Sequence, residues 1–94
     1  MNVRYYTEAE TGEPHVHRHR VAESEVEEVL ARAGEDRPGK DGARVAIGQT
    51  RAGKYLRVIC VVDPEPQGVF VVKAYELRGK PRTAYKPRMR RRRP

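Results

Sequence analysis

The sequence predicts an α+β fold, a small two-layer domain in which one main helix packs on an antiparallel β-sheet with a C-terminal three-stranded meander. Two observations carry this prediction. Apolar residues recur at helical spacing once, in the first half of the chain, and three strand-like apolar runs follow in quick succession in the second half. Segregated helix and strands are typical of α+β domains. The 94 residues suffice for one two-layer core.

The chain begins with a strand candidate at residues 3–6, which are rich in aromatic residues, and a turn follows at residues 10–14. Histidines then occupy alternate positions. On a strand, His15, His17 and His19 would project from one side, a spacing that suits zinc or nickel. No cysteine or carboxylate accompanies them at metal-motif spacing. The sequence therefore favours a surface histidine run, or one functional His19, and predicts no metal site.

A single helix is expected at about residues 23–33. Four apolar residues recur there at helical spacing and form one face: Val26, Val29, Leu30 and Ala33. Ser24 and Glu27 have the spacing of a capping box, and a start nearer Ala22 also fits. Gly34 suits the helix stop.

The second half of the chain is expected to be a loop and a meander. Residues 34–42 hold three glycines, Pro38 and several charges, which predict a loop. Three strands follow, at Arg44–Thr50, Tyr55–Asp63 and Val69–Leu77. The short, glycine-containing connections between them favour antiparallel hairpins.

The two-residue period of a strand assigns side chains to the two faces of the meander. The residues expected to face the helix are Val45, Ile47, Leu56, Val58, Cys60, Phe70, Val72 and Ala74. The residues expected on the other face are Arg44, Ala46, Gly48, Tyr55, Arg57, Lys73 and Tyr75. This second face mixes basic and aromatic side chains over small ones, which suits a shallow phosphate-holding surface. Several aliphatic residues fall on it as well, and one β-bulge would invert the phase.

Charge is divided along the chain. Residues 1–36 hold four Lys/Arg and nine Asp/Glu, a net charge of −5, whereas residues 37–94 hold sixteen and four, a net charge of +12; together they give +7. An acidic N-terminal part and a basic C-terminal part indicate a site for a polyanion in the second half of the chain.

The C-terminus is the most basic part of the chain. Its last seventeen residues carry nine basic side chains and no acidic one. We expect a single domain at residues 1–86 and a basic, disordered tail at residues 87–94 that binds nucleic acid. The expected nucleic-acid-binding residues of this region are Arg82, Tyr85, Arg88, Arg90, Arg91, Arg92 and Arg93.

The apolar runs are too short for a bilayer. None approaches the roughly 18 residues of a membrane span, and the N-terminus lacks the apolar segment of a signal peptide. We therefore expect a cytoplasmic protein with no membrane partner. The single cysteine, Cys60, cannot form an internal disulfide and stands in the apolar run at residues 58–62, so it is expected to be a small buried hydrophobe.

Three segments resemble one family when they are taken together. His19-Arg20-Val21 before the acidic helix resembles its His-Gly-Val motif. Arg44–Thr50, with the strand that follows Gly53, resembles its central hairpin, and Val71–Tyr75 resembles its last strand. In this order and spacing they cover about residues 15–85. The family is that of the BrnT-type toxins and their uncharacterised relatives, within the RelE/ParE-like superfamily.

The resemblance implies a metal-independent endoribonuclease toxin of a type II toxin–antitoxin pair, which cuts RNA without a cofactor and is neutralised by a tightly bound antitoxin. Two motifs depart from the family pattern. Lys73-Ala74-Tyr75 stands where the family usually has Ser-Ala-Arg, and Arg20 stands where it has glycine. These departures favour an alternative, a non-catalytic RNA- or ribosome-binding module of the same fold.

RNA cleavage without a metal needs a base, an acid and cations that stabilise the crowded phosphorane. His19 is the candidate base or acid, because its ordinary pKa lies near neutrality. Arg44 and Arg57 are expected to hold the phosphate, with Arg57 bidentate, and Lys73 to add a point charge. Tyr75 is expected to stack on a base. The acidic helix edge, Glu25, Glu27 and Glu28, is expected to be a solubilising surface rather than a source of catalytic carboxylates.

Overall fold

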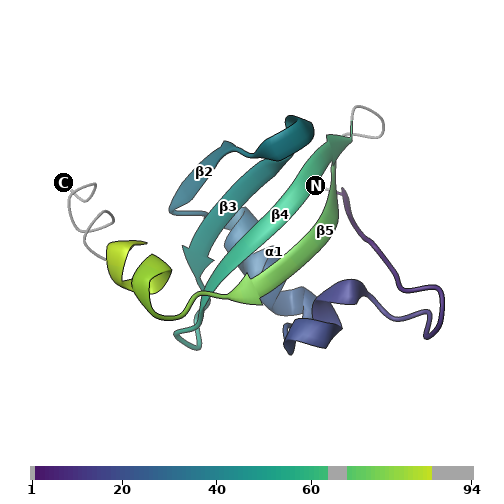
Figure 1. Cartoon of the computed structure of the whole chain (residues 1–94), viewed down its shortest axis with the longest axis horizontal. Helices are drawn as coiled ribbons and strands as arrows, with labels where there is room; N and C mark the ends of the chain where they lie inside the picture. The colour runs from purple at the N-terminus through teal and green to yellow at the C-terminus, as the bar shows by residue number, and fades with distance from the viewer. Residues whose placement is uncertain (1, 64–67, 86–94) are drawn as a thin grey trace.

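In the described part of the chain, a five-stranded sheet carries one long α-helix on its back (Figure 1). The computed structural model describes residues 2–63 and 68–85, so the predicted tail at 87–94 lies outside the described residues. The elements in chain order are β1 (Asn2–Tyr5), η1 (His15–His19), α1 (Glu23–Ala31), β2 (Glu35–Pro38), η2 (Lys40–Gly42), β3 (Arg44–Gln49), β4 (Tyr55–Asp63) and β5 (Gly68–Glu76). A short helix at residues 80–85 follows β5. None of the helices within these described ranges has the length and apolar character that crossing a bilayer requires.

The α+β class is confirmed, but the sheet is mixed rather than purely antiparallel. Its order is β1-β5-β4-β3-β2, with β2 to β5 antiparallel and β1 parallel to β5. The backbone amide of Tyr6 continues the β1–β5 ladder by donating to Val71 O at 2.8 Å. Val3 and Tyr5 pack against the core below the sheet, so the first strand is held by its apolar side chains as well as by its ladder.

The expectation of a loop at residues 34–42 is wrong, because β2 pairs with β3 along residues 35–38. The strand carries charges and Pro38 rather than an apolar alternation, and so gave no strand signal. Such residues suit an edge strand, whose pairing depends on the open backbone of its neighbour. Asp41 and Gly42 then turn the chain with φ of 54° and 78°, and Gly39 N donates to Ala43 O at 2.8 Å.

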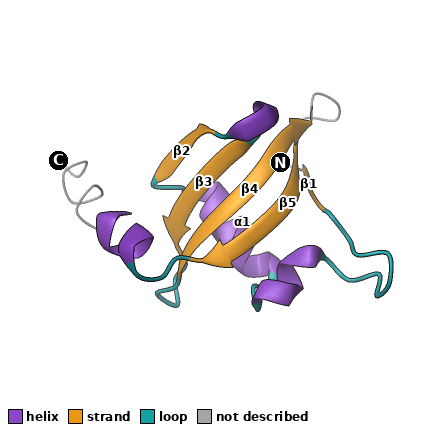
Figure 2. Ribbon diagram, in the orientation of Figure 1, coloured by secondary structure: helices purple, strands orange, loops and turns teal. Residues whose placement is uncertain are grey.

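The main core lies between α1 and the sheet. Val26 and Val29 of α1 are fully buried there with Leu56 and Val58 of β4, as expected. Figure 2 shows α1 behind the sheet and η1 beside the end of β5. The helix begins at Glu23, with Ala22 as its N-cap. The capping carboxylate is that of Glu25, which accepts from Ala22 N at 2.9 Å, so the box starting at Ser24 does not form.

The face assigned to β3 is wrong. Ala46 and Gly48 face α1, and Val45 and Ile47 face away from it. A Cβ on Gly48 would lie 3.2 Å from Cγ1 of Val29, so this position has no room for a larger side chain. The closeness of the helix therefore requires the small residues of β3 beneath it and directs the large ones to the opposite face.

A β-bulge reverses which side chains in the first half of β5 face the helix. Ile59 pairs with Lys73 and Cys60 with Val71, which leaves Val72 as an extra residue. Val71 is therefore fully buried, whereas Val72 is 36% exposed, so the expectation that Val72 and Phe70 face the helix is wrong. Ala74, beyond the bulge, is buried as expected.

A second, smaller core lies on the sheet face opposite α1, which we call the front face. Ile47 packs there with Leu77 and Tyr85, flanked by Val45 and Tyr55. Tyr85 is 3% exposed, and its ring centroid lies 5.8 Å from that of Tyr55. The ring is therefore part of the packing and is not presented for stacking on a base.

Candidate functional site

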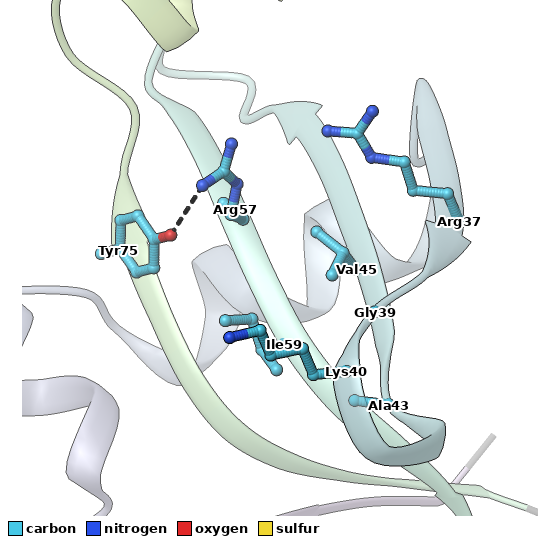
Figure 3. A pocket seen from close by; sticks show the side chains of 8 residues that line it. All are labelled: Arg37, Gly39, Lys40, Ala43, Val45, Arg57, Ile59 and Tyr75. Carbon is cyan, nitrogen blue, oxygen red and sulfur yellow. Dashed lines mark hydrogen bonds between the residues drawn. The ribbon is translucent and has the colours of Figure 1, made fainter.

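A pocket of about 380 Å³ opens on the front face (Figure 3). Its walls combine aliphatic side chains, three cations and one aromatic ring. The lining residues are Arg37, Gly39, Lys40, Ala43, Val45, Arg57, Ile59 and Tyr75. A concave site that is largely apolar, with a few converging polar groups, is the usual form of a ligand pocket.

Two cross-strand rows place these side chains. Ile47, Arg57 and Tyr75 are register partners across β3, β4 and β5. The next row runs from Arg37 through Val45 and Ile59 to Lys73. Register partners share a face of the sheet, so the basic and aromatic residues are interleaved with aliphatic ones.

Arg57 is the central cation of the pocket. Its Nη1 donates to Tyr75 Oη at 2.8 Å, as the dashed line in Figure 3 marks. Its Nε is buried and has no hydrogen-bond partner among the described residues. A buried donor without a partner costs about 1–3 kcal/mol, so this arginine is poorly explained by stability alone.

The pocket cations are not neutralised by the described part of the chain. No ion pair joins Arg37, Lys40 or Arg57 to a carboxylate of the described residues, and the same holds for Lys73, which lies beside the pocket as the register partner of Ile59. Glu35 shares the front face of β2, where it is buried beside its register partner Ile47. Unneutralised cations on adjacent strands repel one another and favour a bound anion.

His19 reaches the edge of this cluster from η1. Its ring centroid lies 6.2 Å from that of Tyr75 and 5.3 Å from that of His15. Partial burial, and then the charge of Lys73, hold the pKa of His19 below its ordinary value of 6.5. The shift favours the neutral imidazole, which is the form able to accept a proton.

The structure brings together four of the five residues predicted to be catalytic. His19, Arg57, Lys73 and Tyr75 gather at the front face, and Arg44 does not. Arg44 is the register partner of Cys60, which faces α1, and its guanidinium pairs with Asp36 at 3.0 Å. Its displacement follows from the inverted phase of β3.

Of the residues predicted to bind nucleic acid, Arg82 and Tyr85 are described and pack near the second core, and the others lie outside the described residues. The guanidinium carbon of Arg82 lies 5.1 Å from the ring centroid of Tyr55, a cation–π geometry next to the second core. Arg88 and the arginines at 90–93 lie outside the described residues.

Sequence reasoning missed Arg37 and Lys40, because both fall in the segment expected to be a loop. One signal could have found them. Asp41-Gly42 directly before the strand at residues 44–49 is a common hairpin turn, which predicts a partner strand upstream. The turn places Lys40 over the pocket, and the paired strand directs Arg37 to the front face.

The three histidines do not converge as they would on a strand. η1 is a 3₁₀ helix, so His17 points away from its neighbours and contacts Glu13 at 3.1 Å and Glu23 at 3.0 Å. His15 contacts Glu8 at 3.0 Å. Within residues 2–63 and 68–85, no group of three or more His, Cys, Asp or Glu residues could hold a metal ion.

The acids of α1 hold the helix in place on the other side of the sheet. Glu25 pairs with Lys54 at 3.1 Å, and Glu28 accepts from Arg51 N at 2.8 Å. Glu27 accepts from the hydroxyl of Tyr5 at 2.7 Å. Burial raises the pKa of Tyr5, and the carboxylate of Glu27 adds to the shift. Through these contacts the acidic side chains attach α1 to β1 and to the turn between β3 and β4.

Comparisons with protein-family models, curated proteins and solved structures found no match for this chain.

Proposed function

We propose that the protein is a metal-independent endoribonuclease toxin of a type II toxin–antitoxin pair, which acts in the cytoplasm and cuts RNA on the front face. The observation that carries the proposal is the cluster of His19, Tyr75 and Arg57, in which an imidazole ring lies beside a tyrosine whose hydroxyl oxygen accepts a hydrogen bond from a guanidinium. It supplies a base, a second proton-bearing group and a phosphate-binding cation within one site.

The roles follow from the chemistry of the groups. His19 accepts the proton of the 2′-hydroxyl, and the 2′-oxygen attacks the adjacent phosphorus. Arg57 and Lys73 stabilise the charge of the phosphorane, and the bond to the 5′-oxygen breaks. The hydroxyl oxygen of Tyr75 accepts the hydrogen bond from Arg57, so the hydroxyl proton of Tyr75 is available for donation to the leaving 5′-oxygen. The products are a 2′,3′-cyclic phosphate and a 5′-hydroxyl end.

The test is cleavage of end-labelled single-stranded RNA by the purified chain in the presence of EDTA. We expect cyclic phosphate ends, and a rate reduced about 10²-fold in His19→Ala. Arg44→Ala is the matched control, because Arg44 lies on the face of α1, and it should cut at the parental rate. RNA that stays intact with the parent chain would refute the catalytic proposal.

A non-catalytic RNA- or ribosome-binding module is the second candidate. It is favoured by Lys73-Ala74-Tyr75, which stands in place of the Ser-Ala-Arg of the family that the chain resembles. Expression alone separates the two. A toxin arrests growth unless its antitoxin is present, whereas a binding module retains RNA without cutting it and leaves growth unchanged. A short neighbouring reading frame for a DNA-binding antitoxin would support the toxin.

A further inference from the structure

We propose that the front-face pocket is a subsite for one unstacked nucleotide of single-stranded RNA, with the phosphate held by Arg57, Arg37 and Lys40 and the base against Val45 and Ile59. The inference rests on the proposed function, because the same face would hold the substrate. It assigns roles to Arg37 and Lys40, which lie outside the cluster of His19, Tyr75 and Arg57.

The cations of the pocket come from three separate segments. Arg57 lies on β4, Arg37 on β2 and Lys40 in the turn of η2. Figure 3 shows the guanidinium of Arg37 directed from the edge strand towards Arg57. The acid next to Arg37, Asp36, is turned to the other face and paired with Arg44. The anion that fits this set carries enough charge to engage more than one cation, as a phosphate does.

The walls indicate what the anion is attached to. Val45 and Ile59 are register partners and are only partly buried, in contrast to Ile47, which Tyr85 and Leu77 cover. Half-exposed branched side chains beside the ring of Tyr75 make an apolar surface on which a flat base can lie. An acidic peptide would satisfy the cations and leave this surface uncovered.

The size of the pocket indicates a single, unpaired unit. About 380 Å³ lies at the lower end of the range for small-molecule sites, which is suited to one nucleotide. Bases within a duplex are stacked on both sides and cannot enter such a site, so a single strand is required.

Gly39 sets the shape of the pocket at its outer wall. A Cβ at this position would lie 2.9 Å from Cγ2 of Val45, so the glycine lets the β2–η2 turn pack directly on the apolar floor. Gly39 is therefore a positioning residue. A larger side chain would push the turn, and Lys40 with it, away from the pocket floor.

The experiment is an NMR titration of the full chain with uridine 3′-monophosphate and with adenosine 3′-monophosphate. Separate titrations use inorganic phosphate, the two nucleosides and a hexaglutamate peptide. We expect a nucleotide to bind more tightly than phosphate or nucleoside, with the largest shifts at the amides of β2, η2 and β4. Lys40→Gln should weaken nucleotide binding about fivefold or more, because one charge-assisted contact is lost. Ile59→Ala should weaken nucleotide binding and leave phosphate binding unchanged.

Arg32→Gln is the matched control, because it removes the same charge from an exposed position at the end of α1 and should leave nucleotide binding unchanged. Equal affinity for phosphate and nucleotide would overturn the base subsite, and tighter binding of hexaglutamate would assign the pocket to an acidic protein segment. Nucleotide binding that is unchanged in Lys40→Gln would also overturn the inference, even if the parent chain cuts RNA. Nucleotide binding without cleavage would refute only the proposed nuclease.

Discussion

Arg57 shows how a single side chain can be costly for the fold and useful for a site. Its stem lies between aliphatic and aromatic neighbours, its Nη1 engages Tyr75, and its Nε lacks a partner among the described residues. The sequence located this residue, because a long cation in the middle of the longest apolar run stands out. It could not show that Arg44 points the other way, since that depends on how closely α1 approaches β3.

Arg57→Ala should abolish RNA cleavage and leave the melting temperature unchanged or higher. The truncation removes the proposed phosphate-binding group, and it also removes a buried donor whose desolvation costs about 1–3 kcal/mol. Thermal melting and the RNA assay on the same preparation measure the two effects. Full activity, or loss of the folded state, would show that Arg57 is peripheral or structural.

His19 gives a prediction about pH. If its neutral imidazole is the base, the cleavage rate should fall at acid pH with a midpoint below 6.5, because burial and then Lys73 lower its pKa. Lys73→Met removes the second of these causes, so the midpoint should move to higher pH while staying below 6.5. The ring signals of His19 in an NMR titration should move with the midpoint. A midpoint that does not respond to Lys73→Met would remove His19 from the proton transfer.

The same shift affects stability with a definite sign. The unfolded chain binds a proton at the ordinary pKa of 6.5, and the folded chain binds it only at lower pH. The His19 contribution to the free energy of unfolding is therefore fully present above pH 6.5 and declines as the pH falls from 6.5 towards the folded-state pKa.

At the scale of the elements, α1, β3, β4 and β5 could be predicted from the spacing of their apolar residues and from the turn residues between them, whereas β2 could not. β3, β4 and β5 lie within a residue or two of their predicted bounds, because the turns that separate them contain glycine or proline. β2 has no apolar alternation, and its pairing is a property of its neighbour. The phase of β5 changes at the bulge after Ile59, which the sequence could allow for but not locate.

Val26→Asp should unfold the domain or destabilise it strongly. Val26 is fully buried between α1 and the sheet, and an aspartate there would bury an unpaired charge. Ser24→Asp is the matched control, because it places the same charge at an exposed position in the first turn of the helix, where the dipole favours it. Circular dichroism during heating measures both. A Val26→Asp variant that melts like the parent would show that α1 is not packed in this way.

At the scale of the whole molecule, the sheet separates charges of opposite sign. Its back is covered by α1, which carries Glu23, Glu25, Glu27 and Glu28. Its front carries the cations of the pocket and the attachment point of the basic C-terminus, since Tyr85 is packed on Ile47. The acids of α1 thus lie on the opposite side of the sheet from the pocket cations, although Arg44 and Lys54 pair with acids on the helix side and Glu35 is buried on the front. The cations at the pocket would orient a polyanion towards it. Composition predicted a basic site in the second half of the chain, and only the fold shows that its pocket cations lie on the front face.

Deleting residues 87–94 should weaken RNA binding and flatten its salt dependence while leaving the fold intact. Five arginines are removed, and each phosphate contact on a single strand contributes roughly −0.7 to the slope of log K against log salt, so the slope should change by up to about 3.5. Deleting residues 80–94 should in addition lower the melting temperature, because it removes Tyr85 from Ile47 and Leu77. Fluorescence anisotropy with labelled single-stranded RNA at several salt concentrations measures the slope. A slope that is the same with and without residues 87–94 would assign the electrostatic contact to the front face alone.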